Sequence, residues 1–318
     1  MATRRLLLAT AAALAGARGA AAQSWPTRPV RIVVGFGAGG LADIVVRLVA
    51  APLAEKLGQN VVVDNRPGAG GALAAQAVAG APADGHTLIL FTSGTSISKA
   101  LFRSLPFDPV TGFAPVSTLA IFDALLLSSN TSPIRAVADL AARRGTPMTI
   151  GTLTAGSTQH LTAEMVRLSS GLQLTPVPFR TSPEVLTALR RGDIDLAIES
   201  YGAAAGDIRD GAVRALASTG SKRSPLLPFV PTLTEAGYRD CVMEGWQAIF
   251  APAGVPDAVV TRLNADIREI LARPAISQRF LELGVEASGS APDALGRLLR
   301  DDIVMWNGII DRAGVERQ

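Results

Sequence analysis

Short apolar runs typical of β-strands alternate with amphipathic helical stretches along the chain. In the first block this pattern predicts strands over 30–36, 60–65 and 86–92, and helices over 42–58 and 71–81. Strands and helices that alternate at this spacing favour parallel βαβ units with right-handed crossovers. The N-terminal block is therefore predicted to be an α/β unit.

The same rhythm returns after the segment 105–120, whose prolines predict an irregular connection. The strands predicted beyond it are 124–129, 148–152, 174–179, 194–200 and 212–219. The helices predicted between them are 136–145, 158–171 and 182–192. A second proline-containing passage covers 222–237, and the chain ends with one strand within 245–256 and helices over 257–272, 274–283 and 292–313.

The single strand before this helical tail needs partners, and the first block is its natural host. A chain that leaves one domain, builds a second and returns would supply them. We therefore predict two α/β domains, the first from 23–124 together with 245–318 and the second from 125–244.

Residues 1–22 have the layout of a secretory signal, with Arg4 and Arg5 ahead of a Leu/Ala stretch and small residues up to Ala22. The apolar stretch is interrupted and too short to span a membrane, so we expect cleavage after Ala22 and export to the periplasm. Cleavage removes three arginines and no acid, which brings 30 basic and 27 acidic residues to 27 of each. With no Lys/Arg-rich run either, nucleic acid is not an expected partner.

Residues that commonly bind metals or perform catalysis are few in this chain. Cys241 is the only cysteine, so no internal disulfide is expected, and its apolar neighbours favour a core position. Neither H-E-x-x-H nor a Cys/His cluster occurs, so no metal site is predicted. The two histidines are His86 and His160. Ser157 and His160 could form a hydrolytic pair, but G-x-S-x-G is absent and no orienting acid is evident.

Gly35, Gly37 and Gly40 spell G-x-G-x-x-G between the first predicted strand and helix. Asp64, at the end of the next strand, lies roughly where a ribose-binding acid belongs in a dinucleotide fold. An exported NAD-dependent enzyme is therefore one interpretation. The amides at a helix N-terminus bind a carboxylate by the same physics, and a tight turn alone also needs small residues.

Several small polar segments follow predicted strands, among them 92–98, 151–160, 179–182 and 199–200. In parallel sheets the loops at the carboxyl ends of the strands face one crevice. We therefore expect a pocket lined with amides and hydroxyl groups, which suits a small anion.

Long segments of the chain beyond the signal resemble the substrate-binding proteins of tripartite tricarboxylate transporters, also called Bug receptors. The segments that carry the resemblance include "WPTRPVRIVVGFGAGGLAD", "VVDNRPGAGG", "FDPVTGFAPV" and "FAPAGVP". The resemblance implies a periplasmic two-domain α/β binding protein of type II, which closes over its ligand like a flytrap. It implies a small carboxylate ligand (a di- or tricarboxylate, an amino acid or an aromatic acid), held by loop amides and waters without an arginine clamp.

The resemblance also implies a monomeric receptor without enzymatic activity or cofactor, whose partner is a membrane permease or a sensor. The residues that match the family's ligand loops are Phe36, Gly37, Ala38, Gly39, Gly40, Asp43, Thr92, Ser93, Ser96, Ser98, Gly156, Ser157, Gln159, His160, Phe179, Arg180, Thr181 and Glu199.

The chain departs from the family pattern at three places near the expected ligand. Gly35 replaces a proline, Ser98-Lys99 replaces an Asn-Pro pair, and Phe179-Arg180-Thr181 replaces Tyr-Lys-Gly. These changes leave the identity of the ligand open.

Overall fold

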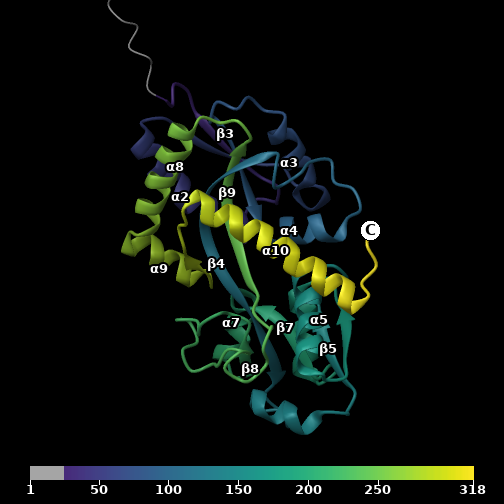
Figure 1. The fold of residues 1–318 in the computed structure, drawn as a ribbon. Helices are drawn as coiled ribbons and strands as arrows, with labels where there is room; N and C mark the ends of the chain where they lie inside the picture. Colours follow the sequence, from purple (N-terminus) through teal and green to yellow (C-terminus); the bar gives the residue numbers. More distant parts are fainter. Residues whose placement is uncertain (1–24) are drawn as a thin grey trace, which may run out of the picture.

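The computed structural model describes residues 25–318, so the predicted signal over 1–22 lies outside the described residues. Figure 1 shows an elongated molecule with helices packed around a long, mixed sheet. The strands are β1 (Val30–Val34), β2 (Val61–Asn65), β3 (Thr87–Thr92), β4 (Phe113–Ser129), β5 (Met148–Thr152), β6 (Leu174–Pro178), β7 (Leu196–Ser200), β8 (Val213–Ser218), β9 (Glu244–Pro252) and β10 (Glu286–Ala287).

The α-helices are α2 (Leu41–Leu57), α3 (Ala72–Ala79), α4 (Ser93–Leu101), α5 (Thr158–Ser170), α6 (Ser182–Arg191), α7 (Tyr201–Arg209), α8 (Asp257–Leu271), α9 (Pro274–Glu282) and α10 (Pro292–Ala313). Two short 3₁₀ helices, η1 (Ala69–Gly71) and η2 (Val137–Arg143), complete the described elements.

The strand order is β2-β1-β3-β9-β4-β7-β5-β6, with β8 and β10 paired to β4. As predicted, β1 pairs in parallel with β2 and β3, and β5 pairs in parallel with β6 and β7. The predicted host of the C-terminal strand is confirmed as well, because β9 pairs with β3 and with β4. Both of these pairings are antiparallel.

The long strand β4 changes partners midway. It pairs with β9 as far as Asp123, opposite Glu244, and from Ala124 onward it pairs with β7 and β8. We call the part built on β1–β3, β9, β10 and the start of β4 the first half. The part built on β5–β8 and the end of β4 is the second half. In Figure 1 these are the upper and lower parts of the molecule.

The prediction of an irregular connection over 105–120 is wrong in its second part, because β4 already begins at Phe113. Pro115 lies inside the strand, where the register with β9 shifts between Pro115 and Ser117. Proline cannot donate a ladder hydrogen bond and is tolerated at such a bulge. The predicted helix over 136–145 is a 3₁₀ helix, Val137–Arg143.

Helix α10 lies across both halves (Figure 1). Its Trp306, Ile309 and Ile310 share one buried cluster with Leu101 of α4 and Leu161 of α5. Burying apolar side chains from three helices in one cluster stabilises the present arrangement of the halves.

Asp302 of α10 carries a carboxylate into this interior and is 8% exposed. The indole Nε1 of Trp246 donates to its Oδ2 at 3.0 Å. Burial raises the pKa of Asp302 to about 6, against the lowering effect of Ser96, Trp246 and Trp306. The folded state thus holds the Asp302 proton more tightly than the unfolded chain does.

We predict that the stability contributed by Asp302 is fully present below pH 4 and is lost as the pH rises through about 6. A shift of about two pKa units corresponds to about 3 kcal/mol. Unfolding titrations from pH 4 to 7.5 should show this slope in the wild type and not in Asp302→Asn. Asp301→Asn, at the exposed neighbour, is the control and should keep the slope, and an unchanged slope in Asp302→Asn would contradict the assignment.

Candidate functional site

A cleft of about 770 Å³ lies where the two halves meet. It is lined by the segments that follow β1, β3, β5 and β7, so the strand ends expected to share a crevice do share one. The predicted residues that line it are Phe36, Gly40, Thr92, Ser93, Ser98, Gly156, Ser157 and Gln159.

Four helices point their N-termini toward this cleft, and three of them are capped by their own hydroxyl groups. Thr92 accepts from Gly94 at α4, Ser157 accepts from His160 at α5, and Ser200 accepts from Ala203 at α7. The N-cap of α2 is Gly40, which has no side chain to cap with. The first amides of a helix have no acceptor within the helix, so those of α2 are free to bind an anion.

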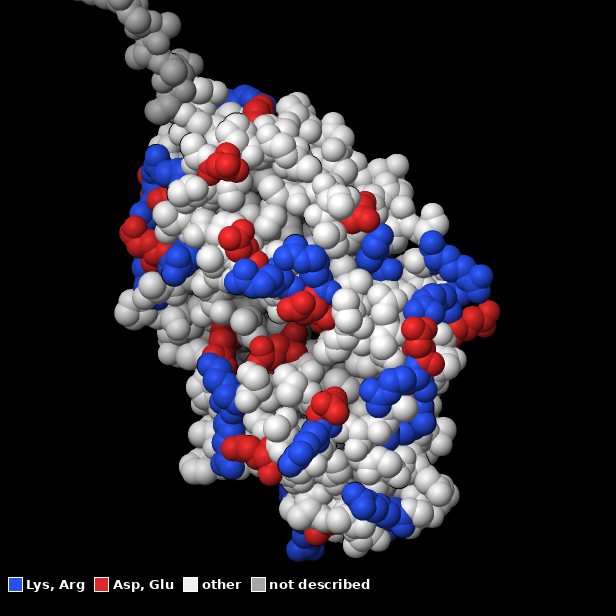
Figure 2. All heavy atoms as spheres, viewed as in Figure 1, with Lys and Arg blue, Asp and Glu red and all other residues white. Residues whose placement is uncertain are grey.

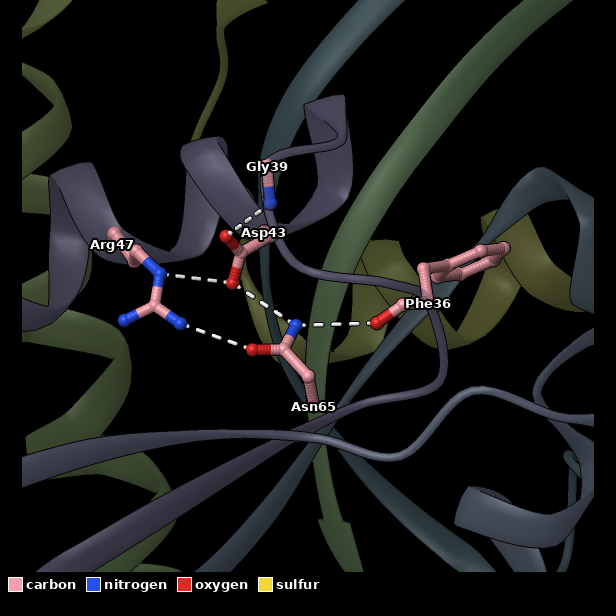
Figure 3. A network of polar contacts seen from close by, with 5 residues as sticks. All are labelled: Phe36, Gly39, Asp43, Arg47 and Asn65. Atoms are coloured by element: carbon pink, nitrogen blue, oxygen red, sulfur yellow. Dashed lines mark hydrogen bonds and ion pairs between the residues drawn. The ribbon is translucent and has the colours of Figure 1, made fainter.

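A polar network centred on the buried Asp43 fixes the segment that leads into α2 (Figure 3). The Asp43 carboxylate accepts hydrogen bonds from the Gly39 amide at 2.9 Å, from Arg47 Nε at 2.9 Å and from Asn65 Nδ2 at 3.0 Å. Asn65 Nδ2 also donates to the Phe36 carbonyl at 3.1 Å. The hydrogen bond from Arg47 contributes most to a lowered pKa of Asp43, and burial acts against it.

In this structure Asp43 therefore holds the loop in place from within and does not line the cleft. It is 3% exposed, and the Gly39 amide is already bonded to it. Gly37, Ala38 and Gly39 are exposed and are not among the residues that line the cleft. Gly39 has a φ of +82°, which favours glycine at that position.

The first glycine of the dinucleotide-like motif has a packing role. A Cβ added to Gly35 would lie 2.6 Å from the Cα of Gly71, so the backbone of the 68–71 segment lies against it. Asp64, the candidate ribose acid, is paired with Arg66 at 2.9 Å and with Arg31 at 3.6 Å. Gly35 and Asp64 thus have local roles that involve no nucleotide.

We predict that Gly35→Ala lowers the free energy of unfolding by about 2 kcal/mol, because the new methyl group meets backbone that cannot rotate away. Gly37→Ala is the matched control, since no heavy atom lies within 4 Å of its added Cβ. That variant should change stability by less than about 0.5 kcal/mol. Chemical denaturation of both proteins checks the pair, and equal midpoints would contradict the packing role of Gly35.

The remaining predicted residues lie behind the cleft or away from it. Ser96 is fully buried next to Asp302. Phe179 packs against a core cluster of the second half, while Arg180 and Thr181 are exposed at the start of α6. They follow β6, which is the last strand of the sheet order and lies two strands from β7. This edge position explains why the 179–182 segment does not line the cleft.

Glu199 and His160 are held one layer behind the cleft. Glu199 is fully buried, and burial raises its pKa against the opposing effect of Ser182, the Ser200 amide and Gln159. The Nδ1 of His160 accepts from the Gly156 amide at 3.2 Å, and burial lowers the His160 pKa. Ser157 Oγ accepts from the His160 backbone, so neither side chain activates the other as a hydrolytic pair would require.

Sequence reasoning missed several residues that line the cleft, notably Leu41, Ala42, Met243 and Gln247, whereas Ser200 belongs to the expected segment 199–200. A helix that begins after a glycine without a capping side chain is a signal for free amides, and it could have pointed to Leu41 and Ala42. Gln247 is a polar residue between apolar neighbours in the middle of its strand, and this too is a readable signal.

No lysine, arginine or histidine is among the residues that line the cleft in the described chain. Lys99, next to Ser98, is turned to Asp108 at 2.9 Å, and Arg47 is bound to Asp43. The cleft therefore offers amides, hydroxyl groups and apolar side chains, together with the carboxylate of Asp123. An anion in it would be held by hydrogen bonds and helix ends, without a paired cation.

A second hollow of about 290 Å³ also lies between the halves and shares Phe122 and Asp123 with the cleft. Its lining includes the carboxylates of Asp123, Glu244 and Glu286, with Lys222 bound to Glu286 at 3.3 Å. Figure 2 shows acidic groups in a hollow at the waist of the molecule. Negative charge of this kind disfavours a carboxylate ligand. The larger cleft shares Asp123 but is lined by neither Glu244 nor Glu286, so it is the better candidate site.

Residues 25–318 hold no group of three or more His, Cys, Asp or Glu placed to bind a metal ion. Within the same residues, no helix combines the length and hydropathy that a bilayer crossing requires.

Residues 45–315 match the family described as Tripartite tricarboxylate transporter family receptor. Protein BugT of Bordetella pertussis is 32% identical over 301 residues, which cover 93% of this chain and 92% of BugT. The structure of Rpa4515 from R. palustris with adipate is 36% identical with a TM-score of 0.76, covering 91% of this chain and 98% of that one. MatC (Rpa3494) from Rhodopseudomonas palustris with bound malate is 32% identical with a TM-score of 0.71, covering 90% of this chain and all of the other (100%).

Proposed function

The chain belongs to the tripartite tricarboxylate transporter receptor family, and we propose that it captures a small carboxylate in the cleft between its two halves. The family consists of periplasmic solute-binding receptors, and its α/β fold is the one described above. The resemblance seen in the sequence is thereby confirmed. Relatives with adipate and with malate support a carboxylate as the ligand of this chain too.

The observation that carries the proposal is the uncapped N-terminus of α2 at the wall of the cleft. Gly40, Leu41 and Ala42 line the cleft, and no side chain competes for the first amides of the helix. A 17-residue helix presents its positive dipole end there. A carboxylate placed at this end would satisfy amides that the protein itself leaves unbonded.

We further propose that the halves act as two domains, 23–124 with 245–318 and 125–244, which close over the ligand. Among the described elements β4 is the only strand shared by the halves, and its change of partner near Asp123 is a natural hinge. We also propose that the receptor is exported through the predicted signal and acts as a monomer. It would deliver its ligand to a membrane permease or a sensor. The receptor would have no enzymatic activity of its own.

A thermal-shift screen tests the proposal. A ligand that binds only the folded state raises the melting temperature with its excess over the dissociation constant. Dicarboxylates, tricarboxylates, amino acids and aromatic acids form one arm, and NADH forms the other. We expect a shift from at least one carboxylate, with no turnover of it, and none from NADH. A shift from NADH alone would favour the exported dehydrogenase instead.

A further inference from the structure

Gln247 lies on the floor of the cleft, in the middle of the first half's sheet. Its strand β9 places it opposite Thr92 of β3 on one side and Ala120 of β4 on the other. Side chains alternate along a strand, so Gln247 shares a sheet face with Ile249, which packs in the core beneath α2. The Gln247 amide and the open end of α2 therefore belong to one compartment of the cleft.

The Gln247 side chain is buried, and its amide oxygen is left unpaired. The residue is 3% exposed and lines the cleft, and its Oε1 has no hydrogen-bond partner among the described residues. A buried amide oxygen without a donor is costly, and native structures rarely retain one without a reason. Its neighbours on the same strand are apolar, so a leucine or methionine would fill this position at lower cost.

We propose that Gln247 determines specificity by accepting a hydrogen bond from a donor group on the ligand. The inference rests on the proposed carboxylate-binding function and names a narrower class of ligand for the same site. With its carboxylate at the N-terminus of α2, the ligand carries a hydroxyl or amino group that meets Gln247 Oε1 once the terminal amide rotates to bring that oxygen to the cleft. An unsubstituted carboxylate fills the same place but leaves that oxygen unpaired.

A hydroxyl group and an amino group can both donate to Gln247 Oε1. Sets of otherwise matched acids show which of the two the receptor recognises. Calorimetric titration of the receptor compares succinate with malate and with aspartate, and adipate with 2-hydroxyadipate and with 2-aminoadipate. We expect at least one substituted acid to bind about tenfold more tightly than its unsubstituted parent, because the parent leaves a buried acceptor unpaired. The hydroxy and amino members tell which donor the receptor reads.

Gln247→Met removes the acceptor at nearly constant volume, and the ratio of affinities within each matched set should fall to about one. Gln278→Met is the control, because it removes an exposed amide on α9 that does not line the cleft, and it should leave the ratio as in the wild type. A ratio measured within one sample does not depend on the fraction of variant that is folded.

Two results would overturn the inference and leave the proposed function standing. One is equal binding of substituted and unsubstituted acids by the wild type, and the other is an unchanged ratio in Gln247→Met. Failure of the wild type to bind any carboxylate would overturn the proposed function and this inference together.

Discussion

Gly40→Asp is expected to weaken carboxylate binding by at least about 100-fold while leaving the protein as stable as the wild type or more so. The N-cap residue of α2 has a φ of −77° and a ψ of 167°, which is the extended geometry of a side-chain cap. An aspartate there would bind the free amides itself and place a negative charge where the ligand carboxylate belongs. A loss of 100-fold corresponds to about 2.7 kcal/mol of binding free energy.

The opposite signs of the two effects separate this prediction from general damage to the fold. A better cap and a less flexible unfolded chain should together raise the free energy of unfolding by about 0.5–1 kcal/mol. Gly40→Ala is the control: its Cβ makes an ordinary 3.6 Å contact with the Gly37 carbonyl, and affinity should stay near that of the wild type. Calorimetry and thermal unfolding measure both quantities, and wild-type affinity in Gly40→Asp would argue against the α2 site.

Asp43→Ala is expected to lower the free energy of unfolding by about 3 kcal/mol and the ligand affinity by about tenfold. The change leaves the Gly39 amide, Arg47 and Asn65 without their shared acceptor. Without that anchor the segment ahead of α2 loses its fixed path, so the amides of the helix end no longer converge. Denaturant unfolding and ligand titration check the two effects.

The pH dependence of this variant has a defined sign. The pKa of Asp43 is lowered in the folded state, so its stabilising effect is present above pH 4 and is lost as the pH falls further. The stability gap between the wild type and Asp43→Ala should therefore narrow in acid. Asp64→Ala, which removes a partly exposed carboxylate with two arginine partners, is the control and should cost less than about 1 kcal/mol. A similar loss in both variants would contradict the anchoring role of Asp43.

Much of the fold could be predicted because periodicity reports which faces are buried. The parallel strands of both halves and the return of β9 to the first half followed from that pattern. Helix α4 was hidden because its sequence, SGTSISKAL, is dominated by small polar residues that are common in loops. It is stabilised by the cap at Thr92 and by packing against α10, and packing between distant segments is not visible in local sequence.

The candidate site was predictable only in outline. Strand ends that face one crevice follow from parallel topology, and they bring Gly40, Ser93 and Ser157 together. The order of the strands does not follow from local pattern, so the edge position of β6, which separates Phe179 from the cleft, could not be foreseen. The role of Asp43 depends in the same way on Asn65, which lies on another strand.

The most direct test of the proposed capture site is an amide NMR titration of the receptor with a carboxylate that raises its melting temperature. A hydrogen bond to an anion moves the resonance of the donating amide, and the proposed position of the anion is the first turn of α2. We predict that the largest downfield shifts at saturation belong to the Leu41 and Ala42 amides, with smaller changes at the capped starts of α4, α5 and α7. Unchanged Leu41 and Ala42 resonances in the saturated protein would contradict the proposed capture site.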